Sequence, residues 1–482
     1  MEPVAGMKRW AILVVTLVMA FITNIDASIV NIAIPVMSEN LNVGTAATTW
    51  VVTAYLIGFT AFIIFFGKLS DLVGKRRVFL SGLAVFTAAS VLCSLPLSLF
   101  GLLVARVVQA LGAGSCMATN FAIIAEVFPE NERGRAFGFA SVAVALGKIA
   151  GPAIGGLILS FLDWRYVFMI NVPIGIVALF FGIRLLPNDD KKTKVRGLLD
   201  FPGSATFALS FIALFIALSE GQAIGFMQPS VVGFIAAAIV LFVLFVLIER
   251  RSSAPMLDLS IFRNRLFSLS ALCAFLGYWT LSCSPLILPL YLQDLLGLEP
   301  HIAAFILLAS PLVTIAVSPI SGYLTDKVGP AILTFIGLVV TVAGYVLMGL
   351  LLDQNTAVSV IVLTIGISAI GGAMFTAPNS TMIMSTVSKD KYGVASSVST
   401  LVRNAGTAFS TAVSSVILYN RISASIGYRV STIVIEHPSS FAYAIQWVFL
   451  VTAGICAIGA ILTGIRLWGS RLRPEETVGG GA

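Results

Sequence analysis

The chain has 482 residues, of which 58% are hydrophobic and only 11% are charged, and its mean hydropathy is +1.01. This composition excludes a soluble globular protein. The net charge of +7 would fit a nucleic-acid partner only if the basic residues formed one surface patch, and their placement along the chain, described below, excludes that partner.

About fourteen apolar stretches alternate with short polar breaks along the chain. A stretch of roughly 18 or more apolar residues is long enough to cross a bilayer as a helix, and helices satisfy their own backbone polar groups in lipid. We therefore predict an all-α integral membrane protein with 14 transmembrane helices. The predicted spans are residues 10–35, 50–69, 78–97, 99–122, 134–160, 165–187, 202–219, 229–249, 267–291, 302–325, 331–352, 356–385, 393–421 and 441–467.

The basic residues indicate the orientation of these spans. If the N-terminus is cytoplasmic, 23 of the 29 Lys and Arg residues fall on the cytoplasmic side. This bias is the positive-inside rule, and it places both termini in the cytoplasm of a multi-pass plasma (inner) membrane protein. The six remaining basic residues are Arg106, Lys148, Arg165, Arg403, Arg421 and Arg429.

Two polar loops divide the chain into three parts. Residues 187–194 and 249–255 bracket the seventh and eighth spans. We predict a six-helix bundle over residues 1–187, a two-helix insertion with its flanking cytoplasmic loops over 188–266, and a second six-helix bundle with a short cytoplasmic tail over 267–482. The architecture is thus 6+2+6.

One short motif recurs in both predicted bundles. Its frame is Gly-x-Leu-x-Asp-x-x-Gly, and it follows the second and the tenth span, as expected for two parallel repeats that move about a central site. We predict that these turns control conformational gating, against the alternative of a basic loop that only sets topology. The gating residues are Gly67, Asp71, Gly74, Lys75, Arg76 and Arg77 in the first copy, and Gly322, Asp326 and Gly329 in the second.

The first and fourth spans carry charged residues at membrane depth. Arg106 begins a polar face that continues through Gln109 and Asn120, and Asp26 is the carboxylate best placed to answer it. An arginine in a membrane costs a few kcal/mol unless it meets water or a carboxylate. We predict that Asp26 and Arg106 serve proton coupling; the alternative is a purely structural buried pair, and the sequence does not say whether the two residues touch.

The fifth span contains a stripe of small residues that predicts close helix packing. The stripe holds Gly147, Gly151, Pro152, Gly155 and Gly156, and in a transporter it would seal against a helix of the other bundle and act in gating. Lys148 interrupts it near the middle of the span. A buried lysine must pair, lose its proton or meet water, with snorkelling to the interface as the alternative.

Other residues are candidates for a central substrate cavity. Arg403 could bind an anionic group, pair with a carboxylate or occupy a water pocket. Aromatic side chains repack around varied ligands, although in membrane helices they also serve packing. The predicted cavity residues are Asn31, Gln109, Asn120, Lys148, Arg403, Tyr278, Trp279 and Phe375.

The sequence predicts neither a catalytic nor a metal site. Its five cysteines and two histidines stand singly, and no Ser/His/Asp or Cys/His constellation appears. There is also no phosphate-binding Gly-x-x-x-x-Gly-Lys-Ser/Thr loop. We therefore expect that the protein is not an enzyme and needs no cofactor, and that a proton gradient is its energy source.

Several of these segments resemble the major facilitator superfamily, specifically its fourteen-helix drug:proton antiporter branch. The Gly67–Arg77 turn, Leu103–Gly112 and Gly147–Gly156 are similar to the signatures of the second-to-third loop, the fourth helix and the fifth helix. The stretches 25–35 and 164–175 resemble segments typical of the fourteen-helix branch. Ala110 and Lys148 depart from these patterns; Lys148 would disfavour cationic substrates unless it is paired.

The resemblance implies a proton-coupled exporter of small lipophilic compounds, of the multidrug efflux type, that works by alternating access. Its partners would be the substrate, protons and the lipid bilayer, with no nucleic acid, and the chain would act as a monomer. Two alternatives stay open: a dedicated exporter of one metabolite, lipid or anionic product, and a non-transporting membrane sensor built on the same fold.

Overall fold

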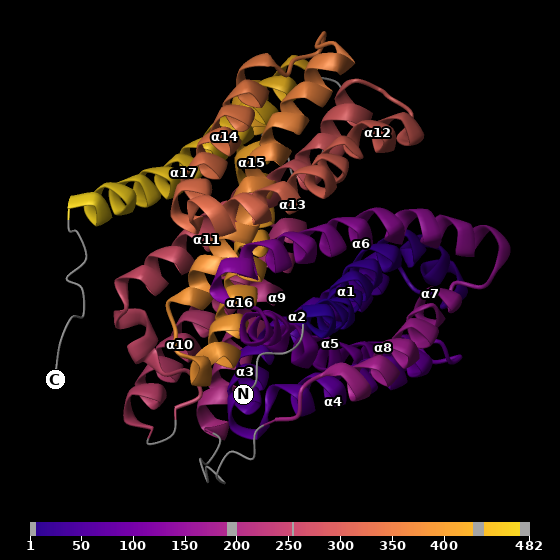
Figure 1. The fold of residues 1–482 in the computed structure, drawn as a ribbon. Coiled ribbons are helices and arrows are strands. Elements are labelled where there is room, and N and C mark those ends of the chain that lie inside the picture. The colour runs from indigo at the N-terminus through magenta and orange to yellow at the C-terminus, as the bar shows by residue number, and fades with distance from the viewer. Residues whose placement is uncertain (1–5, 190–199, 253–254, 428–437, 473–482) are drawn as a thin grey trace.

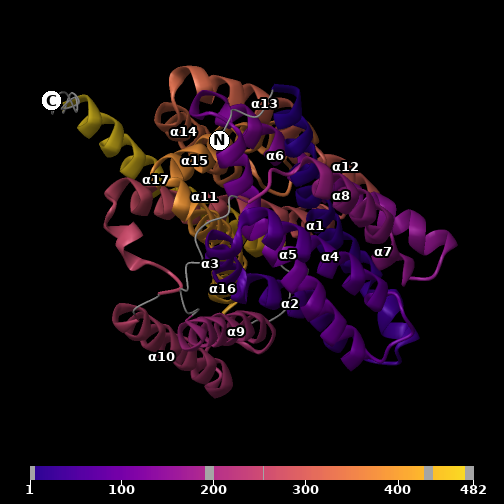
Figure 2. The same cartoon turned by 60° about the horizontal axis from the view of Figure 1, so that its bottom comes forward.

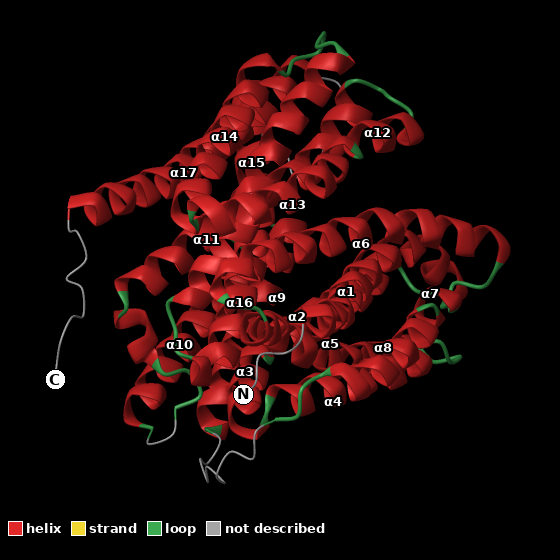
Figure 3. Ribbon diagram, in the orientation of Figure 1, coloured by secondary structure: helices red, strands yellow, loops and turns green. Residues whose placement is uncertain are grey.

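The computed structural model describes residues 6–189, 200–252, 255–427 and 438–472. The described chain is helical throughout and contains no strand (Figure 3). Parts of the predicted loops, together with Arg196, Arg429, His437 and the tail from residue 473, lie outside the described residues.

Seventeen α-helices follow one another along this described chain. The first eight are α1 (Gly6–Asn40), α2 (Thr45–Ala61), α3 (Ile63–Val73), α4 (Lys75–Cys93), α5 (Leu99–Val127), α6 (Arg133–Phe161), α7 (Tyr166–Met169) and α8 (Asn171–Leu185). The others are α9 (Phe201–Ile224), α10 (Pro229–Arg251), α11 (Arg265–Leu290), α12 (Pro300–Leu307), α13 (Ala309–Val328), α14 (Pro330–Leu351), α15 (Val358–Ser385), α16 (Tyr392–Ile426) and α17 (Pro438–Leu472).

Twelve stretches of the described chain are long and apolar enough to cross a membrane, or thirteen if the bent pair α2 and α3 is one span. The predicted thirteenth span coincides with α16, which fails this test by composition although it is 35 residues long. Its polar residues, among them Ser396, Ser397 and Thr400, are buried against neighbouring helices, so they lower the hydropathy of α16 without facing lipid.

Three predicted spans contain breaks. Residues 50–69 form α2 and α3, which meet at Phe62 with a bend of 42°. The sixth span begins with the single turn α7 before α8, and the tenth is divided between α12 and α13. A continuous apolar run predicts the length of a span, but local backbone geometry decides where it bends.

The chain forms two helical bundles and a separate helix pair. We call α1–α8 the N-terminal half and α11–α17 the C-terminal half; in Figure 1 the first is indigo to magenta and the second mostly orange to yellow. Helices α6 and α13 pack against each other between the halves, and α16 packs against α3 and α5. Helices α9 and α10 pack together beside α2 and α16 at one flank (Figure 2).

The two halves repeat one packing device. A Cβ atom on Gly82 of α4 would lie 2.9 Å from the carbonyl oxygen of Gly112 on α5, and one on Gly337 of α14 would lie 2.9 Å from that of Gly371 on α15. Only glycine permits helices to approach this closely, which is how small residues drive helix packing in lipid. The equivalent pairs of helices in the two halves are therefore held by equivalent glycines.

Candidate functional site

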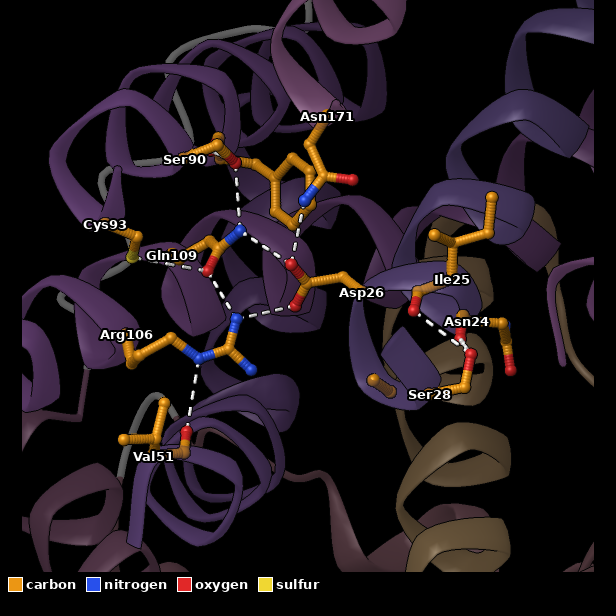
Figure 4. Close-up of polar contacts among 12 residues, drawn as sticks. Asn24, Ile25, Asp26, Ser28, Val51, Ser90, Cys93, Arg106, Gln109 and Asn171 are labelled. Atoms are coloured by element: carbon orange, nitrogen blue, oxygen red, sulfur yellow. Dashed lines mark hydrogen bonds and ion pairs between the residues drawn. The ribbon is translucent and has the colours of Figure 1, made fainter. Parts of the chain in front are cut away.

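Asp26 and Arg106 form an ion pair inside the N-terminal half. Arg106 Nη1 lies 2.7 Å from Asp26 Oδ2, and both side chains are 0% exposed. The other carboxylate oxygen, Oδ1, accepts hydrogen bonds from Gln109 Nε2 at 3.0 Å and from Asn171 Nδ2 at 2.8 Å. Three donors from α5 and α8 thus converge on one carboxylate of α1 (Figure 4).

The guanidinium of Arg106 is held by more than this carboxylate. Its Nη1 also donates to Gln109 Oε1 at 2.6 Å, and its Nε donates to the carbonyl oxygen of Val51 on α2 at 3.1 Å. The rings of Tyr55 and Phe168 lie 4.2 and 5.4 Å from the guanidinium carbon. Cation–π contacts of this kind stabilise a charge away from water.

Sequence reasoning missed several residues of this network. Asn171, Ser90 and Val51 contact it from three further helices, and Ser90 Oγ accepts from Gln109 Nε2 at 2.9 Å. Of these residues, Asn171 could have been identified from the sequence, because it lies within the 164–175 stretch that resembles the family. Val51 acts through its backbone, so its side chain carries no signal.

Two aspartates join the halves at the end of the bundle where α1 begins, which we call the basic end. Asp71 at the end of α3 accepts from the backbone N–H groups of Gly393 and Val394 at 2.8 and 2.9 Å. These groups open α16, and an anionic group is favourable at a helix N-terminus.

The second aspartate repeats this contact with the halves exchanged. Asp326 at the end of α13 accepts from the N–H groups of Gly134 and Arg135, which open α6, at 2.7 and 3.1 Å. We call the two contacts together the aspartate latch. Both copies of the recurring sequence motif therefore place their aspartate on the first turn of a helix in the opposite half.

The glycines of the motif make the latch possible. A Cβ on Gly67 would lie 2.7 Å from the carbonyl oxygen of Gly393, and one on Gly134 would lie 2.5 Å from that of Gly322. Gly74 and Gly329 turn the chain after each aspartate with φ of +110° and +92°, a backbone conformation that side chains with a Cβ rarely adopt.

The basic residues of the first motif make protein contacts. Lys75 is buried and pairs with Glu126 at 2.6 Å. Arg76 donates to the side chain of Asn188 and to the carbonyl oxygen of Ile183, and the backbone N–H groups of Arg76 and Arg77 donate to Asp189. The motif thus fastens α3 and α4 to the rest of the N-terminal half.

The predicted seal of the glycine stripe against the other half is wrong. Cβ atoms on Gly147, Gly151 and Gly155 would meet Phe21, Ser28 and Ile29, all on α1 of the same half. Gly156 faces open space, and α6 continues through Pro152 to Phe161. The stripe lies on the α1 side of α6, whereas Gly134 and Gly138, near the start of α6, contact α13.

Three of the predicted cavity residues are instead buried within one half. Gln109 belongs to the Asp26 network, Asn120 Nδ2 donates to the carbonyl oxygen of Thr16, and Phe375 packs against Tyr278. The helical periodicity of Gln109 and Asn120 marked a face, but that face packs on neighbouring helices of the same half.

The other predicted cavity residues keep accessible surface. Asn31 and Lys148 are exposed, and Arg403, Tyr278 and Trp279 are half-buried. Lys148 on α6 and Arg403 on α16 come from opposite halves. Within the C-terminal half, the guanidinium carbon of Arg403 lies 6.0 Å from the ring centroid of Tyr278.

The described residues contain no group of His, Cys, Asp and Glu side chains arranged to hold a metal ion. The five cysteines are buried and unpaired, and Cys93 donates to Gln109 Oε1 of the Asp26 network at 3.6 Å.

Known proteins match this chain over nearly its whole length. A family model described as Major Facilitator Superfamily matches residues 16–411 and 270–481. The riboflavin transporter RibZ of Clostridioides difficile is 32% identical, over 95% of this chain and 97% of its own length. The multidrug resistance protein Stp of Mycobacterium tuberculosis is 30% identical, over 84% of this chain and 75% of its own length.

Solved structures agree on the fold. The human organic anion transporter MFSD10 (TETRAN) superposes with a TM-score of 0.65, covering 96% of this chain and 99% of its own, and the proton:xylose symporter XylE gives the same TM-score with 96% of each chain covered. Each shares 13% sequence identity with this chain, so each likeness concerns the fold alone. Together with the family match, these findings identify the chain as a multi-pass membrane transporter of the Major Facilitator Superfamily.

Proposed function

We propose that this transporter is a proton-coupled exporter of small lipophilic compounds and belongs to the fourteen-helix drug:proton antiporter branch. The observation that carries this proposal is the Asp26 carboxylate, which lies fully buried at membrane depth and accepts hydrogen bonds from two side-chain amides and a guanidinium. An ionisable group inside a membrane protein is costly and is therefore a candidate for an ion pathway.

The geometry explains how a proton would act there. When Asp26 is ionised, both oxygens accept hydrogen bonds, and Arg106 Nη1 lies 2.7 Å from Oδ2. A proton on Oδ2 would turn that acceptor into a donor facing another donor, and it would leave the charge of Arg106 without a counter-ion. Protonation thus favours a different arrangement of α1 and α5, and a sealed site can exchange its proton only when that arrangement opens.

Release of the aspartate latch would allow the two halves to move relative to each other. Hydrogen bonds between the halves lie at the basic end in the described part of the chain, apart from the one that joins Asn404 to Thr60. We assign the basic end to the cytoplasm by the positive-inside rule. The structure is then closed toward the cytoplasm, and release of the two aspartates from α6 and α16 would open that side.

The membrane topology follows from this assignment. Counting α16 as a span, together with the bent pair α2 and α3, yields fourteen spans in a 6+2+6 order. The protein lies in the plasma membrane, and both termini are on its cytoplasmic side. Residues 188–266 form the insertion. We propose that the chain works as a monomer, without a cofactor, and that the proton gradient is its energy source.

Two substrate ranges are consistent with the relatives. Stp is named a multidrug resistance protein, which favours broad efflux of lipophilic compounds, whereas RibZ is named a riboflavin transporter, which favours a single metabolite. Lys148 and Arg403 favour a second candidate, a dedicated exporter of an anionic product. A panel of substrates separates the two, because broad efflux predicts transport of several unrelated compounds.

Transport in proteoliposomes with an imposed pH gradient tests the coupling. We expect gradient-driven flux of a lipophilic compound in the wild type and none in Asp26→Asn. Asp163→Asn is the matched control, because it removes an exposed carboxylate from a loop ion pair with Arg165 and should leave flux unchanged. Gradient-driven flux that survives Asp26→Asn would contradict the proposed role of this carboxylate.

A further inference from the structure

An apolar cavity of about 520 Å³ lies between the helix pair α9 and α10 and the two halves. Its volume falls within the range of roughly 300–1,000 Å³ that is usual for ligand sites. The walls come from all three parts of the chain, with Ile64 on α3, Phe245 on α10 and Val398 on α16. We call it the phenylalanine cavity, because its lining includes Phe207, Phe211, Phe242, Phe245, Phe262 and Phe275.

One cation stands at the rim of this cavity. Arg250 is the only charged side chain among the described residues that line it, and the others are apolar. Arg250 lies at the end of α10, is exposed, and forms no ion pair with an acid of the described chain. Sites for small polar molecules carry a few polar groups that fix the ligand's orientation. An apolar interior with a single cation at its rim suits instead a long apolar chain that ends in an anion.

The cavity lies in the part of the bundle next to the basic end. Ala405, the lining residue farthest along its helix from that end, is thirteen residues beyond Tyr392, the first residue of α16. Thirteen residues of helix span about 20 Å. One leaflet accounts for half of an apolar bilayer core that is about 30 Å thick. The cavity therefore matches the depth of one leaflet, with Arg250 at the level of the lipid head groups.

The cavity reaches the outer surface of the protein. Phe242 is 45% exposed and Phe262 is 39% exposed, whereas Phe207 and Phe245 are buried. In a membrane the medium beside such an opening is lipid. An unfilled apolar cavity would lose dispersion contacts along its walls. An acyl chain is the group that the surroundings supply to fill it.

A buried acid holds the loop that forms one wall of the cavity. Glu249 accepts hydrogen bonds from the backbone N–H groups of Met256 and Leu257 at 3.1 and 3.3 Å, and Leu257 lines the cavity. The acid that precedes Arg250 in the sequence therefore binds the loop, and the guanidinium of Arg250 stays available for an anion.

We propose that the phenylalanine cavity binds an anionic phospholipid, with one acyl chain among the phenylalanines and the phosphate group at Arg250. Basic pockets between transmembrane helices are known to bind anionic head groups on the cytoplasmic side of membranes. The binding does not depend on the proposed transport function. Only its assignment to the cytoplasmic leaflet rests on the orientation proposed above.

The bound lipid would also stabilise the aspartate latch. Ile64 is on α3, which carries Asp71, and Val398 is on α16, whose first turn binds Asp71. These two walls are held together while Asp71 is bound to α16, and they would separate when it is released. A ligand shifts a protein toward the state to which it binds better. The phospholipid therefore favours the closed latch.

Native mass spectrometry of the full-length protein in detergent micelles tests the site with three probes. These are phosphatidylglycerol, diacylglycerol with the same acyl chains, and glycerol phosphate. We expect phosphatidylglycerol to bind about fivefold more tightly than diacylglycerol, which lacks the phosphate, and glycerol phosphate, which lacks the chains, to displace neither. Arg250→Gln should weaken phosphatidylglycerol binding about fivefold and change diacylglycerol binding less than about twofold.

Each variant has a matched control on the same helix. Arg251 is exposed and does not line the cavity, so Arg251→Gln should change phosphatidylglycerol affinity less than about twofold. Val246→Phe places a ring in the cavity and should weaken binding of both lipids about tenfold, because the ring takes the room of about two methylene groups. Val240 is 64% exposed, and Val240→Phe should weaken neither lipid.

Three results would overturn the proposal. The first is a phosphatidylglycerol affinity that Arg250→Gln leaves unchanged or that Arg251→Gln lowers equally. The second is displacement of the lipid by glycerol phosphate, because the acyl chain would then contribute nothing. The third is a lipophilic compound whose binding is lost in Val246→Phe while phosphatidylglycerol still binds that variant as it binds the wild type, which would assign the cavity to a transported substrate.

The latch and the transport function are tested separately. Phosphatidylglycerol should lower labelling of a single cysteine at the start of α16 in the wild type but not in Val246→Phe; unchanged labelling in the wild type would refute the effect on the latch. Asp26→Asn should bind phosphatidylglycerol as the wild type does, because Asp26 is enclosed by Arg106 and does not line the cavity. Loss of flux in that variant would therefore leave the lipid site standing, and loss of lipid selectivity would leave the exporter standing.

Discussion

Removal of either partner of the buried Asp26–Arg106 pair should destabilise the protein strongly, and removal of both should cost no more than removal of one. Asp26→Asn leaves the guanidinium of Arg106 without a counter-ion and turns one acceptor oxygen into an amide that faces a donor. Arg106→Gln leaves a fully buried carboxylate with only the neutral donors of Gln109 and Asn171. Each single change should lower the free energy of unfolding by about 3–5 kcal/mol.

The double variant should recover much of this loss. Two neutral amides of similar volume can hydrogen-bond to each other, so its cost should be about 3 kcal/mol or less, and the coupling energy of the cycle should be at least about 3 kcal/mol. Equilibrium unfolding in mixed micelles measures the free energy of unfolding of the wild type, the two single variants and the double variant. Transport distinguishes stability from coupling, because the double variant should fold and yet show no gradient-driven flux.

An exposed ion pair provides the matched control for this double-mutant cycle. Asp163 and Arg165 lie 3.0 Å apart in a loop and are partly exposed, so Asp163→Asn and Arg165→Gln should couple by under about 1 kcal/mol. Changes at Asp26 and Arg106 that add independently, to within about 0.5 kcal/mol, would refute the reasoning that burial makes this pair interdependent.

Three further predictions concern the latch, the glycine stripe and a surface ion pair. Asp71→Asn combined with Asp326→Asn should raise solvent accessibility at the start of α6 and α16, measured by labelling of single cysteines, because both helix N-termini lose an anion; unchanged labelling would contradict the latch. Gly151→Leu should separate α1 from α6 and lower thermal stability without changing this labelling, since its neighbours belong to the same half. Lys391 lowers the pKa of Asp258 to about 2 from an ordinary value near 3.8, so this pair should stabilise the fold above about pH 4 and lose its effect as the pH falls through 2. The difference in unfolding free energy between wild type and Asp258→Asn should therefore be full at pH 6 and mostly lost at pH 2.

The spans were predictable from the sequence because lipid imposes a single requirement, a long apolar helix. The exception is α16, where hydropathy and structure disagree, since buried Ser397 and Thr400 donate to backbone carbonyl oxygens one turn earlier in the same helix. The bend at Phe62 has no proline or glycine to mark it in the sequence.

The candidate site was predictable where a charged side chain inside the membrane needed a partner of opposite charge. Asp26 and Arg106 are conspicuous at membrane depth, and the structure shows that they touch. The direction of a helix face was harder, because three-residue spacing places Gln109 and Asn120 on one stripe without saying whether that stripe meets a cavity or another helix. The partner of the Gly147 stripe was likewise undetermined, since small residues predict close packing but not against which helix.

The bend between α2 and α3 has a mechanical consequence. One end of this span holds the carbonyl oxygen of Val51 against Arg106, and the other carries Asp71 into the opposite half. A straight helix would transmit a shift at one end to the other as a rod does. A 42° joint at Phe62 interrupts that rod. Under the proton coupling proposed above, the joint would let the Val51 end shift while Asp71 stays bound to the opposite half, and its stiffness would set how closely the two movements are linked.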